Sequence, residues 1–316
     1  MYLPLSHGHT MYYEVHGLKD GPTALVLHGG PGAGLSHSAL SMFNLHKWRV
    51  VLYDQRGCGK STPFGVESLT HNRTENLLED MERLRIELGV DAWYLTGGSW
   101  GSTLALLYAE AYPKRVFGML LRSVCLTDSK ESAWLYEPNG AAQVFPDAYE
   151  QFLSVLTPAQ RKGSMETILH AYKRRLASPD MRIRDKAAAA WTGYEDAVIS
   201  LIPEKPTFKG KADVSVAILE NYYFLNNAWL RPNQILQDAH KIRHIPLVVI
   251  HGRYDMICPY RSIQLLSEVL PKMRILRVDD GGHSGYGPTA MAYGRHITDT
   301  IVGKSSKRKT RKKRRQ

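Results

Sequence analysis

A serine set between glycines is the feature of this sequence that most clearly predicts chemistry. Gly97, Ser99 and Gly101 form a G-x-S-x-G pattern, which places a serine on a sharp turn from a strand into a helix. Side chains at the flanking positions would crowd such a turn, so glycine fits there. An apolar run precedes the pattern and the helix formers of residues 103–109 follow it. The pattern therefore predicts that Ser99 is a nucleophile standing proud of a sheet.

An acid and a base follow this serine in the order that such a nucleophile requires. In enzymes with this turn the chain order is nucleophile, acid, base, and the last two lie on loops after later strands. Asp255 follows the apolar run of residues 246–251, and His283 follows the run of residues 274–279. We therefore expect Asp255 to be the acid and His283 to be the base.

Other acidic residues and histidines fit these roles less well. Asp279 and Asp280 lie too close to His283 in the sequence to reach it from a separate strand. His28 and His251 each end an apolar run, where a histidine with a structural hydrogen bond is the commoner outcome. The expected set stays Ser99, Asp255 and His283.

Acyl transfer assigns a role to each of these groups. His283 would take the proton of Ser99 during attack and return it to the leaving amine. Asp255 would hold the imidazole tautomer and stabilise its charged form. The tetrahedral oxyanion needs two backbone NH donors, and we expect them from Trp100, directly after the nucleophile, and from Gly30 in an earlier glycine-rich loop.

The elements that position these residues follow an α/β pattern. Short, almost continuous apolar runs of the kind buried in a parallel sheet occur at residues 23–28, 48–53, 116–121, 246–251 and 274–279. Between them, residues 75–88 have the spacing of an amphipathic helix, and Asn72 has the features of its N-cap. Alternating strands and helices predict a mostly parallel, doubly wound sheet.

The strand pattern is interrupted in the middle of the chain. From residue 125 to residue 240, alanine-rich and charged helical patterns take over, punctuated by prolines. We expect a core domain formed by residues 1–124 and 241–303, with residues 125–240 inserted as a helical cap. A chain of 316 residues, 43% of them hydrophobic, is long enough to bury such a core.

The formal net charge of +11 is concentrated at the C-terminus. Nine basic residues and no acidic ones lie within residues 304–316, which leaves a net charge of +2 for residues 1–303. A segment of this composition cannot pack, and we expect a disordered tail. Its charge suits weak binding to polyanions or nuclear import, whereas the nearly neutral body argues against a nucleic-acid-binding protein.

The cysteines and the N-terminal residues favour a reducing compartment for this protein. Cys58, Cys125 and Cys258 are too few and too scattered for a disulfide framework or a CxxC metal site. Residues 1–15 lack a signal-peptide pattern, and no stretch reaches the length of a membrane span. We expect a cytoplasmic protein without a membrane partner.

Five ordered motifs resemble those of the proline iminopeptidase family of α/β-hydrolases. They are HGGPG at residues 28–32, DQRGCGKS at 54–61, GGSWGS at 97–102, GRYDMICP at 252–259 and GGHS at 281–284. The resemblance extends from about residue 12 to about residue 284. It implies an α/β-hydrolase fold with a helical cap, and release of N-terminal proline from peptides without a metal or cofactor.

The resemblance also implies how the substrate amine is recognised. By motif, the two cap glutamates that bind the free amine fall on Glu195 and Glu220. Both have mainly apolar neighbours three and four positions away and no cation one helical turn away, so a ligand ammonium would supply the missing charge. Tyr136 matches a pocket aromatic and Cys258 follows the family pattern near the site. Cys125 stands where the family tends to place another aromatic.

Three other enzyme or scaffold classes remain as alternatives. An esterase or an aminoacyl amidase with a broader range would keep the triad but have no use for paired cap acids. An epoxide hydrolase would need a carboxylate in place of Ser99. A non-catalytic scaffold would be expected to have lost part of the triad, which is complete here.

Overall fold

A single sheet organises the chain, and the computed structural model describes residues 1–202, 207–284 and 292–301 of it. The strands are β1 (Tyr2–Pro4), β2 (Thr10–Gly17), β3 (Thr23–Leu27), β4 (Arg49–Tyr53), β5 (Trp93–Ser99), β6 (Val116–Val124), β7 (Leu247–Gly252) and β8 (Arg274–Val278). Their order across the sheet is β1-β2-β4-β3-β5-β6-β7-β8. β2 runs antiparallel to β1 and β4, and the other pairs are parallel. The mostly parallel α/β sheet predicted from the sequence is confirmed, and the tail of residues 304–316 lies outside the described part.

The buried strands read as apolar runs because helices or loops cover both faces of the sheet. β3 has the sequence TALVL and every residue in it is buried. β2 instead alternates, with Met11 and Tyr13 buried and Tyr12, Glu14 and His16 less so. The hairpin of β1 and β2 has no continuous apolar run, because antiparallel strands with one less buried face show a period of two.

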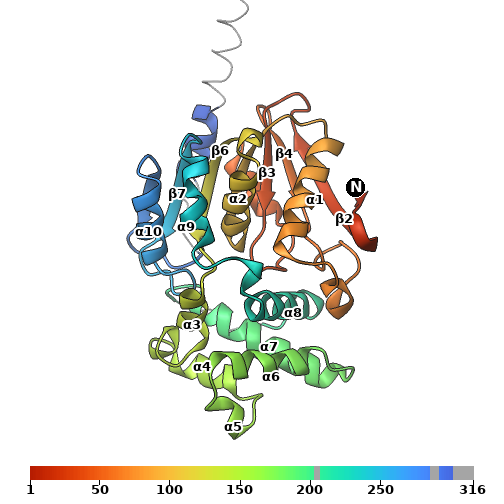
Figure 1. Cartoon of the computed structure of the whole chain (residues 1–316), viewed down its shortest axis with the longest axis vertical. Helices are drawn as coiled ribbons and strands as arrows, with labels where there is room; N and C mark the ends of the chain where they lie inside the picture. Colours follow the sequence, from red (N-terminus) through yellow and green to blue (C-terminus); the bar gives the residue numbers. More distant parts are fainter. Residues whose placement is uncertain (203–206, 285–291, 302–316) are drawn as a thin grey trace, which may run out of the picture.

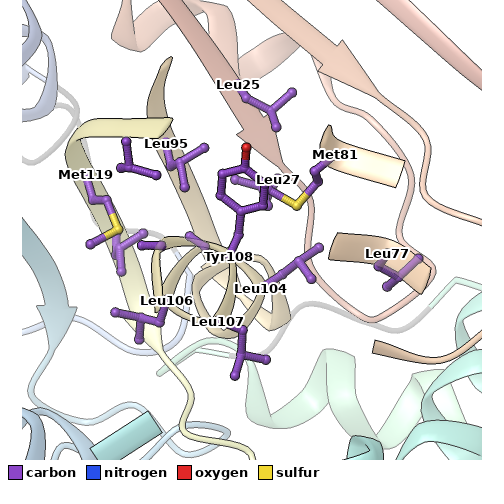
Figure 2. Close-up of a cluster of buried hydrophobic side chains, with 14 of the residues drawn as sticks. Leu25, Leu27, Leu77, Met81, Leu95, Leu104, Leu106, Leu107, Tyr108 and Met119 are labelled. Carbon is purple, nitrogen blue, oxygen red and sulfur yellow. The ribbon is translucent and has the colours of Figure 1, made fainter. Parts of the chain in front are cut away.

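Helices pack on one face of the sheet around a large apolar cluster. They are α1 (Thr74–Glu87), α2 (Trp100–Ala111), α9 (Gln234–Asp238) and α10 (Arg261–Val269). Tyr108 of α2 points toward Leu25 of β3, and Leu104 points toward the side where Met81 of α1 lies (Figure 2). The opposite face is covered by η2 (His37–Met42) and the helical residues 292–301.

The expected N-cap of α1 is wrong by one position. The residue at the N-cap is Arg73, and Asn72 is almost fully buried. The Asn72 amide donates to the carbonyl of Arg56 at 3.2 Å, and its oxygen accepts from Tyr223 at 2.9 Å. Asn72 therefore links its own segment to those of Arg56 and Tyr223. These are long-range contacts, which a local capping pattern cannot predict.

Six helices form a separate layer at one end of the sheet, in the lower half of Figure 1. They are α3 (Ser129–Tyr136), α4 (Pro146–Leu153), α5 (Pro158–Arg161), α6 (Met165–Leu176), α7 (Met181–Val198) and α8 (Lys211–Leu225). Their apolar faces share a cluster of their own, in which the ring of Trp191 packs against those of Tyr172 and Phe152. None of the helices in the described ranges combines the length and apolar character that a membrane crossing needs.

Helix α8 packs against both layers. Ile218 belongs to the apolar cluster of the cap helices, and Tyr223 belongs to that of the sheet. The Ser215 hydroxyl donates to the carbonyl of Gly57 at 3.0 Å, and Tyr223 bonds Asn72 as described above. α8 is therefore a wall common to the sheet and the cap helices.

Candidate active site

The turn between β5 and α2 holds Ser99 in a strained backbone conformation. Its φ of 55° and ψ of −129° lie in a region that non-glycine residues rarely occupy and that clusters at functional sites. A Cβ on Gly97 would lie 2.5 Å from the carbonyl oxygen of Gly101, and one on Gly101 would collide with the carbonyl oxygen of Leu27. The two glycines therefore allow β5, α2 and β3 to approach closely enough to form the turn.

Asp255 and His283 meet at the carboxyl ends of β7 and β8. His283 Nδ1 lies 2.9 Å and 3.0 Å from the two carboxylate oxygens of Asp255. Burial would raise the pKa of Asp255, but the adjacent His283 charge and hydrogen bond outweigh this and hold the pKa below its ordinary value. An ionised Asp255 can only accept, so Nδ1 carries a proton and Nε2 of His283 is left as the acceptor.

The Asp255 carboxylate is also fixed from its own loop. Its Oδ1 accepts from the backbone NH groups of Ile257 at 3.0 Å and Cys258 at 2.8 Å. Such local bonds between an aspartate and the following NH groups shape the turn itself. The carboxylate therefore keeps its position independently of the imidazole.

Ser99 and His283 line one cavity of about 350 Å³ between the sheet and the cap helices. Of the nine residues singled out by the sequence, eight line it: Gly30, Ser99, Trp100, Tyr136, Glu195, Glu220, Cys258 and His283. Asp255 is the ninth and lies behind His283, almost fully buried. The structure thus brings all nine together, and their roles remain predictions.

Two backbone NH groups border the nucleophile. Trp100 is the first residue of α2, and the first NH groups of a helix have no acceptor within the helix. Gly30 lies in the loop after β3 with a φ of 101°, a left-handed conformation that glycine adopts without strain. Because β3 and β5 are adjacent parallel strands, both groups reach the same edge of the sheet.

Gln55 ties this loop to α2 and was not identified from the sequence as a site residue. Its side chain donates to the carbonyl of His28 at 3.0 Å and accepts from the indole NH of Trp100 at 2.9 Å. One amide side chain therefore links the start of the loop that carries Gly30 to the side chain of Trp100. The only available signal was its place in the DQRGCGKS motif, directly after a buried strand.

The two histidines that competed for the role of base have structural hydrogen bonds. His28 Nε2 accepts from the backbone NH of Gln55 at 3.0 Å. His251 Nδ1 accepts from the NH of Val124 at 3.1 Å, and its Nε2 donates to the carbonyl of Cys258 at 2.9 Å. Burial lowers the pKa of both imidazoles, which matches neutral rings that support loops.

Glu195 on α7 and Glu220 on α8 form a carboxyl pair at the cap side of the cavity. The two carboxyl groups lie close enough for each to act on the pKa of the other. Tyr136 donates to Glu195 Oε1 at 2.6 Å, and the indole of Trp191 donates to Glu220 Oε2 at 2.7 Å. These donors fix both carboxyl groups while leaving each with further oxygen lone pairs.

Burial raises the pKa of both glutamates, and the charge of Glu195 raises that of Glu220 further, well above its ordinary value. Within residues 1–202, 207–284 and 292–301, neither carboxyl group takes part in an ion pair. Lys209 lines the same cavity, but its charge acts on Asp196. Two neighbouring desolvated acids without a cation are costly, so the environment favours a protonated form of the pair, and a cationic ligand would offset the same cost.

A further acid, the half-buried Glu131, lines the cavity and was not identified from the sequence. Glu131 accepts from the backbone NH groups of Leu126 at 2.9 Å and Thr127 at 2.6 Å, and from the hydroxyl of Ser262. Burial raises the pKa of this carboxyl group. Its contacts shape the loop after β6, so it supports the cavity wall.

Two thiols lie side by side in the same wall. Cys258 is 1% exposed, and burial raises the pKa of its thiol well above the ordinary value. The neighbouring thiol of Cys125 also raises this pKa; Cys125 is only partly buried and also lines the cavity. Small side chains at both positions leave room in the cavity.

Comparisons with known proteins agree with this geometry. The family described as alpha/beta hydrolase fold matches residues 22–287. A probable proline iminopeptidase of Leptolyngbya boryana is 42% identical over 289 residues, covering 89% of this chain and 87% of that protein. The proline iminopeptidase of Neisseria meningitidis serogroup B is 38% identical, covering 91% of both chains. That of Arabidopsis thaliana is 40% identical, covering 90% of this chain and 75% of its own.

Solved structures share the architecture at low sequence identity. An α/β-fold family hydrolase from Bacillus anthracis str. Sterne superposes with a TM-score of 0.62 at 15% identity, covering 95% of this chain and 98% of its own. The α/β-hydrolase enzyme MGS-M2, from a deep-sea metagenome library, gives 0.61 at 16% identity, with 95% and 97% covered. At such identities the likeness shows the fold alone. The sequence relatives go further, and this chain belongs to the proline iminopeptidase family of α/β-hydrolases.

Proposed function

We propose that this chain is a serine hydrolase that releases an N-terminal proline from peptides. Two lines of support converge. The relatives with 38% to 42% identity are described as proline iminopeptidases. The strained Ser99 and His283, which contacts Asp255, line the same cavity as Glu195 and Glu220, and this shared lining supports the proposal.

The chemistry proceeds through an acyl-enzyme. Ser99 Oγ attacks the prolyl carbonyl carbon while His283 Nε2 takes its proton. The oxyanion that forms is stabilised by the NH groups of Gly30 and Trp100. Collapse breaks the C–N bond as His283 returns the proton to the leaving amine, and Asp255 stabilises the imidazolium throughout. A water activated by His283 then releases proline and restores Ser99.

The carboxyl pair is the single observation that carries the exopeptidase assignment. A prolyl N-terminus is a secondary ammonium with two N–H donors, and Glu195 and Glu220 offer one acceptor group each. Binding replaces a proton retained between two buried acids by a cation hydrogen-bonded to both. A peptide nitrogen has no charge and at most one N–H, so an internal or acylated proline cannot provide the same contacts.

Apolar side chains beside the carboxyl pair suit the pyrrolidine ring. Tyr136, Leu135 and Phe224 border this part of the cavity, and Tyr136 also orients Glu195. The small Cys125 and Cys258 complete the wall. We propose that these two leave the pocket wide enough for other small N-terminal residues in addition to proline.

A panel of amino-acyl arylamides, with N-acetylprolyl arylamide and a simple acyl ester, tests this assignment. Free prolyl arylamide should be hydrolysed with the highest kcat/KM, and acetylation should remove most of that activity. Equal turnover of the free and acetylated compounds would refute the exopeptidase assignment and favour an esterase or a broad amidase.

The domain arrangement and the tail complete the proposal. Residues 125–240 act as the cap over a core of residues 1–124 and 241–303, with α8 common to both. Residues 304–316 add weak, sequence-independent polyanion binding to a cytoplasmic enzyme and can direct nuclear import. A chain ending at Gly303 should lose retention on heparin and keep its arylamidase activity.

A further inference from the structure

Three side chains outside the proposed active-site cavity converge on one point. Glu14 and His16 are two residues apart on β2, so their side chains share one face of the sheet. His37 begins η2 on that same face. His16 Nε2 and His37 Nε2 lie 2.9 Å and 2.7 Å from the same oxygen, Glu14 Oε2.

We propose that Glu14, His16 and His37 form a binding site for one Zn²⁺ or a similar divalent transition-metal ion. One donor atom from each residue falls within 4.8 Å of the other two. Imidazole nitrogens and a carboxylate oxygen bind zinc at about 2.0 to 2.2 Å. Three protein ligands leave the fourth position of a tetrahedral zinc site for a water molecule.

A neighbouring hydroxyl orients the carboxylate for this role. Tyr12 donates to Glu14 Oε1 at 2.8 Å, and Lys60 Nζ in turn donates to the Tyr12 oxygen at 3.2 Å. The oxygen held by Tyr12 is the one that the histidines do not contact, so Oε2 stays directed between the two rings. Hydrogen bonds to the outer atoms of metal ligands are what positions such ligands in metal sites.

The exposure of the three side chains provides an entry path. The side chain of Glu14 is 17% exposed and that of His37 is 62% exposed, so the site opens to solvent on the histidine side. Among the described residues, the Nε2 atoms of both histidines hydrogen-bond only Glu14. Metal binding therefore replaces two short hydrogen bonds within the site and breaks no other hydrogen bond of either Nε2 atom in the described part of the chain.

Two other groups have suitable donors, but other contacts already use those donors. In the group of His28, Asp54 and Cys58, the imidazole accepts from a backbone NH and the carboxylate accepts from the NH groups of Leu35 and Lys60. The remaining group is the Asp255–His283 pair with Cys258. Neither can take a metal without losing loop contacts.

The proposed ion would cross-link two segments. It joins β2 to η2, which follows the loop that carries Gly30. Because the unfolded chain does not hold these three ligands together, metal binding should raise the temperature of unfolding.

Calorimetric titration of the full, chelator-treated chain with Zn²⁺ tests the site. The parent should bind one ion per chain with micromolar or stronger affinity, and His37→Ala should weaken binding by at least about tenfold. His46→Ala removes another exposed histidine from the same region and should bind as the parent does. Anomalous scattering from a zinc-soaked crystal should place the ion between His16 and His37.

Controls on folding keep the result interpretable. His16→Gln and Glu14→Gln provide second and third variants, and circular dichroism verifies that each is folded. Absence of binding by the parent at high-micromolar Zn²⁺ would overturn the site. So would parent-like affinity in the folded His37→Ala and His16→Gln variants, since the ion would then lie elsewhere.

Discussion

Replacing Glu220 by glutamine tests whether Glu220 binds the substrate amine through its charge or only supports the cavity wall through hydrogen bonds. In the parent, the Trp191 indole donates to Glu220 Oε2 at 2.7 Å. The amide oxygen of glutamine can accept the same hydrogen bond, but glutamine carries no charge. Glu220 is 4% exposed, so its charge is poorly screened. Two unit charges about 3 Å apart interact by about 5 kcal/mol at an effective dielectric constant of 20. An amide dipole recovers part of this, which leaves a loss of about 2 to 4 kcal/mol, typical of a buried charged pair.

This loss corresponds to a fall in kcat/KM for prolyl arylamide of about 30-fold to 1000-fold. Hydrolysis of an uncharged ester should stay near the parent value, because the triad does not contact Glu220. Glu166→Gln is the matched control, since Glu166 lies exposed on α6 of the same cap; it should leave both activities unchanged.

Glu220→Gln should lower activity but should not lower the thermal stability of the folded chain. The pKa of Glu220 in the folded chain lies well above its ordinary value, so the folded state binds a proton that the unfolded state has released. Stability from this group therefore falls as pH rises above about 4.3. Glu220→Gln removes that penalty and should melt at or above the melting temperature of the parent at pH 8, with the difference vanishing near pH 4.

Equal losses of amide and ester hydrolysis in Glu220→Gln, together with a lower melting temperature, would refute the proposed role of Glu220 in amine recognition.

Three further substitutions have distinct outcomes. Ser99→Ala should abolish labelling by a serine-directed fluorophosphonate, and labelling that persists would place the nucleophile elsewhere. Cys125→Ala should protect activity against N-ethylmaleimide, because Cys125 is the more exposed thiol of the cavity while Cys258 is buried with a raised pKa; protection by Cys258→Ala instead would contradict this. Burial raises the pKa of Glu110 to about 9, so the folded chain loses stability as pH rises from about 4.3 toward that value. Glu110→Gln should raise the melting temperature at pH 8 and not at pH 4, and a lower melting temperature at pH 8 would disprove it.

The sequence predicted the fold well where a signal is local. The run of residues 116–121 lies within β6, and the order Ser99, Asp255, His283 is that of three loops at one edge of a sheet. Apolar periodicity and glycine spacing are properties of neighbouring residues, so they survive in a single sequence.

Features set by long-range contacts could not be predicted in this way. Whether Glu195 and Glu220 touch depends on how α7 packs against α8. Gln55 and Asn72 owe their positions to partners on other elements. No local pattern reports a hydrogen bond between segments that the chain brings together only after folding.

The contacts of helix α8 with the core determine which segments must be transferred together to move substrate specificity from one enzyme of this architecture to another. Glu220 is carried by a helix that is bonded to the core at Gly57 and Asn72, whereas Glu195 and Tyr136 belong to helices that contact mainly the cap cluster. Grafting the segment before residue 203 onto another scaffold would transfer Glu195 without Glu220, and so only half of the proposed amine-binding pair. Recombination would preserve substrate specificity only if the crossover lies beyond residue 225, so that α8 is included. The core segments that bond α8, around Gly57 and Asn72, would have to be transferred as well.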